Sequence, residues 1–100
     1  MMALSNNAEE LGCDRHILEL YVAGDNLSSR RAIDNLDEIV SRLASRPDDV
    51  VVVDVRRDPK AAFSRQIFAT PSLVSIRAGR RILIVGDLSD RDAVVERLSL

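Results

Sequence analysis

The sequence predicts an α/β domain with the element order βαβαββα, in which a four-stranded mixed sheet is flanked by helices. Three observations support this: a helical apolar pattern between two strand-like segments, a β-branched run at 50–55, and two apolar runs separated by Ala78-Gly79. A helix between two strands is typical of a parallel pair with a right-handed crossover. A two-residue connection that contains Gly is typical of an antiparallel hairpin. One hundred residues are enough for one such domain.

The first half is predicted to be a strand, a helix and a second strand. Residues 16–23 alternate apolar and other side chains, as a half-buried strand does. A helix is expected over 30–45, because apolar residues recur there every three or four positions, and Ser28 or Ser29 is expected to be its N-cap. The run 50–55 is apolar on both faces, which is typical of a buried parallel strand.

The second half begins with a short helix and continues with the hairpin. Pro59 suits the first position of a helix that would extend over 60–68. Its inward-facing side chains would be Ala62, Phe63 and Ile67. Strands are expected over 72–77 and 80–85.

A last helix is expected after the segment Ser89-Asp90-Arg91-Asp92. This segment resembles a capping box in which Asp replaces the usual Glu. Ala93, Val94 and Leu98 would form the apolar stripe of this helix.

This order of elements is that of the thioredoxin-like fold, which changes the expectation for Pro71. Most X-Pro bonds in folded proteins are trans. In the thioredoxin-like fold, however, a cis-proline opens the third strand, and Ala69-Thr70-Pro71 lies at that place. We therefore expect Pro71 to be a structural cis-proline.

Redox and metal chemistry lack the residues that they need. The loop after the first strand, Asp25-Asn26-Leu27-Ser28-Ser29, contains no thiol, and Cys13 precedes that strand. A single cysteine and a single histidine, His16, exclude a disulfide-exchange pair and leave almost no material for a metal site or a His-based triad. We expect no catalytic residues, no metal and no cofactor. A glutathione- or thiol-transfer enzyme that uses Ser28 or Ser29 is the weaker alternative.

Charge and hydropathy argue against nucleic acid and membranes as partners. The net charge is -2 and the isoelectric point is about 5.3, so no basic field attracts phosphate. No apolar run approaches the roughly 20 residues that span a bilayer. We expect a cytoplasmic protein with a flexible tail over 1–15 and one domain over 16–100.

Five segments carry a pattern that resembles a known family. They are Leu20-Tyr21-Val22-Ala23-Gly24, Val53-Asp54-Val55, Asp58-Pro59, Ala69-Thr70-Pro71-Ser72-Leu73 and Gly86-Asp87-Leu88-Ser89-Asp90-Arg91. Their residues and spacing, from about His16 to Leu100, resemble KaiB, a family of circadian-clock proteins. The sensory domain of the clock-output kinase SasA shares the fold and part of the pattern.

The resemblance implies a non-enzymatic protein that binds the KaiC ATPase ring. It also implies a KaiA-like or kinase partner, a dimeric or tetrameric form, and a second fold whose C-terminal half, beginning near residue 57, is rearranged to give the order βαββααβ. The turn Arg77-Ala78-Gly79-Arg80 replaces the family's usual proline-rich turn and favours the thioredoxin-like arrangement. Candidate partner-binding residues are Tyr21, Gly24, Arg30 and Arg31. A SasA-like sensory module is the alternative function.

Overall fold

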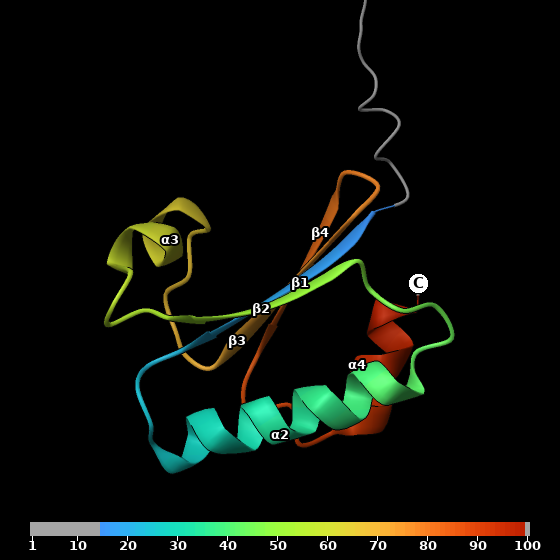
Figure 1. The fold of residues 1–100 in the computed structure, drawn as a ribbon, viewed down its shortest axis with the longest axis horizontal. Helices are drawn as coiled ribbons and strands as arrows, with labels where there is room; N and C mark the ends of the chain where they lie inside the picture. The colour runs from blue at the N-terminus through green and yellow to red at the C-terminus, as the bar shows by residue number, and fades with distance from the viewer. Residues whose placement is uncertain (1–14, 100) are drawn as a thin grey trace, which may run out of the picture.

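The computed structural model describes residues 15–99, which form the predicted elements in the predicted order (Figure 1). In chain order they are β1 (His16–Val22), α2 (Leu27–Arg42), β2 (Asp49–Asp54), α3 (Pro59–Ser64), β3 (Ser72–Arg77), β4 (Arg80–Val85) and α4 (Arg91–Leu98). The order βαβαββα is confirmed, and the alternative βαββααβ is not the one observed. The predicted tail, with Cys13, lies outside the described residues except for Arg15.

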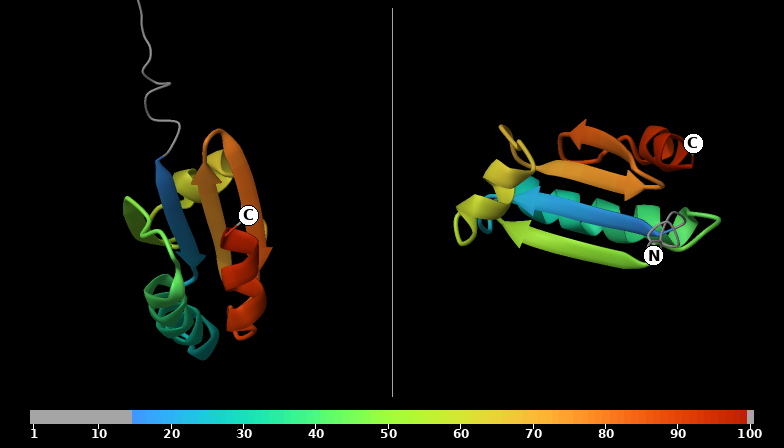
Figure 2. Two further views of the ribbon diagram at one scale, coloured as in Figure 1. Left: turned by 90° about the vertical axis from the view of Figure 1, so that its right-hand side faces the viewer. Right: turned by 90° about the horizontal axis from the view of Figure 1, so that it is seen from above.

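The four strands form one mixed sheet in the order β2-β1-β3-β4. β1 pairs with β2 in parallel and with β3 antiparallel, and β3 and β4 form the antiparallel hairpin. The register places Leu20 of β1 between Val52 and Leu73. Figures 1 and 2 show α2 and α4 on one face of this sheet and α3 on the other.

Two apolar clusters occupy the two faces of the sheet. The larger one lies between the sheet and the helices α2 and α4; its buried members are Leu18, Leu20, Val22, Ala32, Leu36, Ile39, Leu73, Leu88, Val94 and Leu98. The smaller one, beneath α3, contains Tyr21, Ala62 and Val74. Because successive side chains of a strand point to opposite faces, the alternation of β1 divides its residues between the two clusters.

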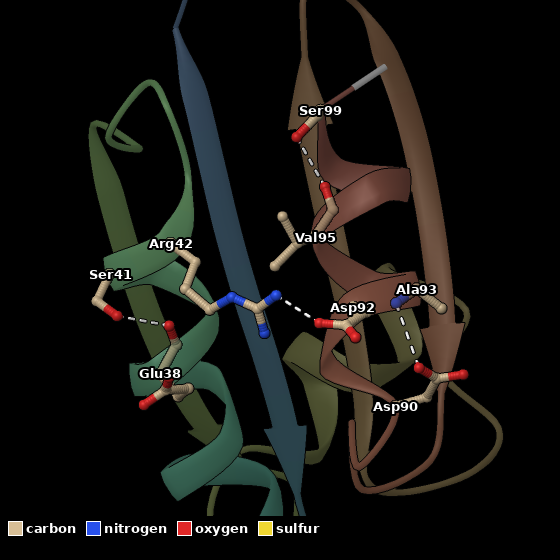
Figure 3. Close-up of polar contacts among 8 residues, drawn as sticks. All are labelled: Glu38, Ser41, Arg42, Asp90, Asp92, Ala93, Val95 and Ser99. Carbon is tan, nitrogen blue, oxygen red and sulfur yellow. Dashed lines mark hydrogen bonds and ion pairs between the residues drawn. The ribbon is translucent and has the colours of Figure 1, made fainter.

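A polar contact at the surface joins α2 to α4 (Figure 3). The guanidinium of Arg42, at the end of α2, pairs with the carboxylate of Asp92 in the first turn of α4. This hydrogen bond and the charge of Arg42 lower the pKa of Asp92. Asp90 caps α4, since its Oδ1 accepts from the Ala93 N–H at 3.3 Å. The expectation of a capping box that begins at Ser89 is therefore wrong by one residue.

β2 is an edge strand, which the sequence did not predict. Val50, Val51 and Val52 are 45%, 44% and 47% exposed, whereas a buried strand was expected. A β-branched run favours extended backbone wherever the strand lies in a sheet. Its lateral position depends on pairing with distant strands, and here only β1 pairs with it.

α2 begins earlier and ends earlier than the sequence predicts. Its N-cap is Asn26, whose Oδ1 accepts from the Ser29 N–H at 2.8 Å. Neither Ser28 nor Ser29 is therefore the cap. The helix ends at Arg42 instead of near residue 45.

α3 is also shorter than expected, and Phe63 points away from the sheet. The helix ends at Ser64, and Gln66 has a positive φ of 59° that a helix cannot accommodate. Ala62 packs against Tyr21 and Val74, and the next residue along a helix lies about 100° around its axis. Phe63 is consequently 82% exposed.

Candidate partner-binding site

The topology collects several loops at one end of the sheet. β1, β2 and β4 end there and β3 begins there, so the segments 23–26, 55–71 and 86–90 lie at this end. Figure 1 shows the start of α2 and the whole of α3 at this end, on opposite faces. The Thr70-Pro71 peptide bond is cis, and the carbonyl of Pro71 accepts from the Gly86 N–H at 2.9 Å.

Gly24 occupies a position that a side chain would obstruct. Its φ is +75°, and a Cβ built on it would lie 2.2 Å from the guanidinium of Arg56. The Asp54 Oδ1 accepts from the N–H groups of both residues, at 3.1 Å for Gly24 and 3.0 Å for Arg56. These two hydrogen bonds lower the pKa of Asp54, and the one from Arg56 has the larger effect. The loops after β1 and β2 are thus held together, and Arg56 lies over Gly24.

Tyr21, a predicted contact residue, is buried and belongs to a polar network beneath α3. It is 2% exposed, and its hydroxyl donates to Glu19 Oε1 at 2.9 Å. Burial, followed by the bond to Glu19 and its charge, raises the pKa of Tyr21 to about 12. Burial disfavours the Glu19 carboxylate, but hydrogen bonds from Arg65 and Tyr21 outweigh this, so the pKa of Glu19 is lowered. Tyr21 therefore packs beneath α3 and is not part of the exposed surface.

Arg30 and Arg31 lie in the first turns of α2 and are exposed. Arg30 Nε lies 3.6 Å from the Asp25 carboxylate, and both side chains are largely open to solvent. Screening makes such an exposed pair weak, so Arg30 can exchange Asp25 for another acidic group. The structure therefore places Gly24, Arg30 and Arg31 at one end of the sheet, on the α2 side.

Sequence reasoning missed the most exposed apolar group of the described residues. Phe63 and Phe68 are 82% and 89% exposed, although buried positions are usual for phenylalanine. Phe68 lines a shallow hollow of about 230 Å³ together with Val55, Ala62, Ile67, Ala69 and Thr70. We call Arg56, Arg57, Lys60, Phe63 and Phe68 the α3 surface. The sequence contained one indication of this surface, because both phenylalanines of the chain occur within six residues.

Neither a metal-binding cluster nor a membrane-spanning helix occurs among the described residues. Among residues 15–99, no group of three or more His, Cys, Asp and Glu side chains is arranged to hold a metal ion. Within the same range, no helix is both long and apolar enough to cross a membrane. The exposed groups at this end of the sheet include the basic side chains of Arg30, Arg31, Arg56 and Arg57 and the aromatic rings of Phe63 and Phe68.

Comparison with known families decides the identity of the domain. Residues 19–100 match the model of the KaiB domain. The chain belongs to the KaiB family. It is 40% identical over 85 residues to the circadian clock oscillator protein KaiB of Prochlorococcus marinus subsp. pastoris, covering 85% of this chain and 79% of that protein. The KaiB of Trichodesmium erythraeum is 39% identical over 85 residues, covering 85% and 82%. The KaiB family consists of non-enzymatic clock proteins.

Solved structures confirm the thioredoxin-like fold of this KaiB homologue. Thioredoxin from Fasciola hepatica is similar with a TM-score of 0.70 and 19% identity, over 92% of this chain and 88% of that one. The N-terminal domain of SasA from Synechococcus elongatus is similar with a TM-score of 0.69 and 23% identity, over 85% and 80%. At these identities, the likeness concerns the fold alone.

Proposed function

We propose that this KaiB homologue is a cytoplasmic regulatory protein that docks on a KaiC-type ATPase ring through the α3 surface. The observation that carries the proposal is the exposure of Phe63 and Phe68 on a family member whose relatives are clock proteins. Arg30 and Arg31, on the other side of the same end, extend the contact.

Two exposed aromatic rings provide the apolar part of such an interface. Burying a phenylalanine side chain contributes about 1.5–3 kcal/mol, and aromatic residues dominate the energy of many interfaces. Phe63 projects from α3, and Phe68 lies beside the hollow lined by Val55 and Ile67. This hollow gives a partner side chain a place to insert next to Phe68.

Basic side chains provide the polar rim. Arg56, Arg57 and Lys60 are exposed and precede Phe63 along the chain. Arg56 and Arg57 lie 3.7 and 3.9 Å from the Asp54 carboxylate, contacts that are loose enough to be exchanged for an acidic partner. Charges at a rim mainly set the rate of association and its dependence on salt.

A second exposed surface is available to a further partner. The β2 edge presents Val50, Val51 and Val52 together with unpaired backbone groups, which is the usual requirement for strand addition. We assign this edge to a KaiA-like or kinase partner or to a second copy of the chain. The α3 surface would remain free for the ATPase ring.

Co-elution tests the main proposal. The purified chain is mixed with the KaiC-type ATPase of its own organism and ATP, incubated for hours, and separated by size-exclusion chromatography. Co-elution is expected for the parent chain. The Phe63→Ala, Phe68→Ala double variant should bind at least about tenfold more weakly, because 1.4 kcal/mol corresponds to a factor of ten. Val50→Ala, an exposed apolar change at the β2 edge, serves as the control and should bind like the parent. No co-elution of the parent at high excess would overturn the proposal.

A further inference from the structure

A buried histidine joins three segments where β1 begins. His16 is 4% exposed. Its backbone N–H donates to Asp48 Oδ2 at 2.7 Å, and its carbonyl accepts from the Asp48 N–H at 2.8 Å. Its ring Nε2 lies 2.8 Å from Ser75 Oγ, and Ser75 is itself 3% exposed. The backbone of His16 therefore holds the segment that leads into β2, and its ring holds β3.

The surroundings of the ring disfavour a positive charge. Arg77 lies directly opposite His16 in the β1–β3 register, and both side chains line one hollow of about 180 Å³. The negative charge of Asp48 favours a charged ring, but its carboxylate already accepts a hydrogen bond from the backbone N–H of His16. Arg15 and Asp49, the neighbouring charges, neutralise each other in an exposed pair at 2.7 Å.

Among residues 15–99, the helices that close this hollow bring no titratable side chain to it. Their lining residues are Leu43, Ala44 and Ser45, which follow α2, and Leu98 and Ser99 at the end of α4. The C-terminal carbonyls of helices favour a cation, which opposes the effect of Arg77. Burial is nevertheless the largest influence and, with Arg77, it lowers the pKa of His16 despite Asp48.

We propose that His16 makes the pairing of β1 with the β3–β4 hairpin sensitive to acid: a positive charge on this buried ring opposite Arg77 is unfavourable, so protonation weakens this end of the sheet. The proposal goes beyond partner binding and does not depend on it. His16 is the single histidine of the chain, and histidine is the side chain whose ordinary pKa lies between pH 5 and 8.

The sign of the effect follows from linkage. Because the pKa of His16 is lowered in the folded state, the unfolded chain binds the proton more readily. The stabilisation is complete above the unfolded pKa of about 6.5 and is lost as the pH falls below it. One pH unit below that value, the unfolding equilibrium constant can rise by at most about tenfold from this one group.

Two measurements test the proposal. An NMR titration of the His16 ring in the parent chain should give a midpoint below about 6.5. Urea unfolding between about pH 7.5 and about pH 5.5 should show the unfolding constant of the parent rising, by no more than about tenfold, and that of His16→Gln rising less than that of the parent. A ring midpoint at or above 6.5, or equal pH dependence in parent and variant, would overturn the proposal.

If His16→Gln does not fold, hydrogen exchange of the parent chain tests the proposal. After correction for the intrinsic effect of pH on exchange, the amides of β3 should open more often at about pH 5.5 than at about pH 7.5, while those in the middle of α2 change less. Unchanged opening of β3 would contradict the proposal.

Discussion

Arg65 donates two hydrogen bonds to Glu19, from Nε to Oε1 at 2.8 Å and from Nη2 to Oε2 at 3.0 Å. Glu19 lies in the middle of β1, and Arg65 follows α3 directly. Tyr21 donates to the same carboxylate, and the guanidinium of Arg81 donates to the Arg65 carbonyl. This network fixes the start of the segment between α3 and β3 against the sheet.

Replacing Glu19 by Gln should lower the free energy of unfolding by about 1–2 kcal/mol, because a neutral amide cannot accept both Arg65 donors equally well. The loss is moderate because the Arg65 side chain is 43% exposed and screened by solvent. Urea unfolding at neutral pH measures it. Glu38→Gln, on the exposed side of α2, is the control and should change stability by less than about 0.5 kcal/mol. Equal effects of the two changes would mean that the network does not stabilise the fold.

Tyr21 should ionise near pH 12 in the folded chain and near pH 10 in urea. Ultraviolet absorbance follows this directly, because the chain has one tyrosine and no tryptophan. Since the raised pKa favours the neutral phenol in the folded state, stability should fall as the pH rises from about 10 to about 12. A folded-state midpoint near 10 would show that the phenol is neither buried nor bound to Glu19.

Gly24→Ala and Gly79→Ala should cost similar stability but differ in their effect on binding. Both glycines have a positive φ, +75° and +78°, so alanine costs about 1 kcal/mol at either position. Only at Gly24 does the new Cβ meet a neighbour, the guanidinium of Arg56, which must move. Gly24→Ala should therefore weaken binding to the KaiC-type ring, whereas Gly79→Ala should not. Equal affinities would exclude Arg56 from the interface.

Asn26→Ala should destabilise the chain by about 1 kcal/mol, because it removes the acceptor for the Ser29 N–H at the start of α2. Ser28→Ala, at an exposed neighbouring position, should change stability by less than about 0.5 kcal/mol. Thermal or urea unfolding distinguishes the two variants. A larger loss of stability for Ser28→Ala than for Asn26→Ala would indicate that Ser28 is the N-cap, as the sequence predicted.

Local sequence patterns predicted the order of the elements because their signals act over short distances. The alternation of β1, the helical period of α2 and the Ala78-Gly79 turn all depend on neighbouring residues. The cap of α2 was less certain, since several residues between 25 and 29 can cap a helix. Only the backbone path shows that Asn26 does so.

Features that depend on distant partners could not be predicted. The edge position of β2 follows from how the strands pair, and the contact of Glu19 with Arg65 joins residues far apart in the chain. The outward direction of Phe63 depends on which turn of α3 meets the sheet. Of the candidate contact residues, Tyr21 lies inside, because strand alternation alone does not reveal what covers each face.

Hydrogen exchange of the chain, alone and bound to the KaiC-type ATPase ring, tests the proposed interface most directly. On binding, the amides of residues 56–68 should become protected, because a docked partner would cover the α3 surface. Protection confined to β2 and the far end of α2, with residues 56–68 unchanged, would place the interface elsewhere and contradict the proposal.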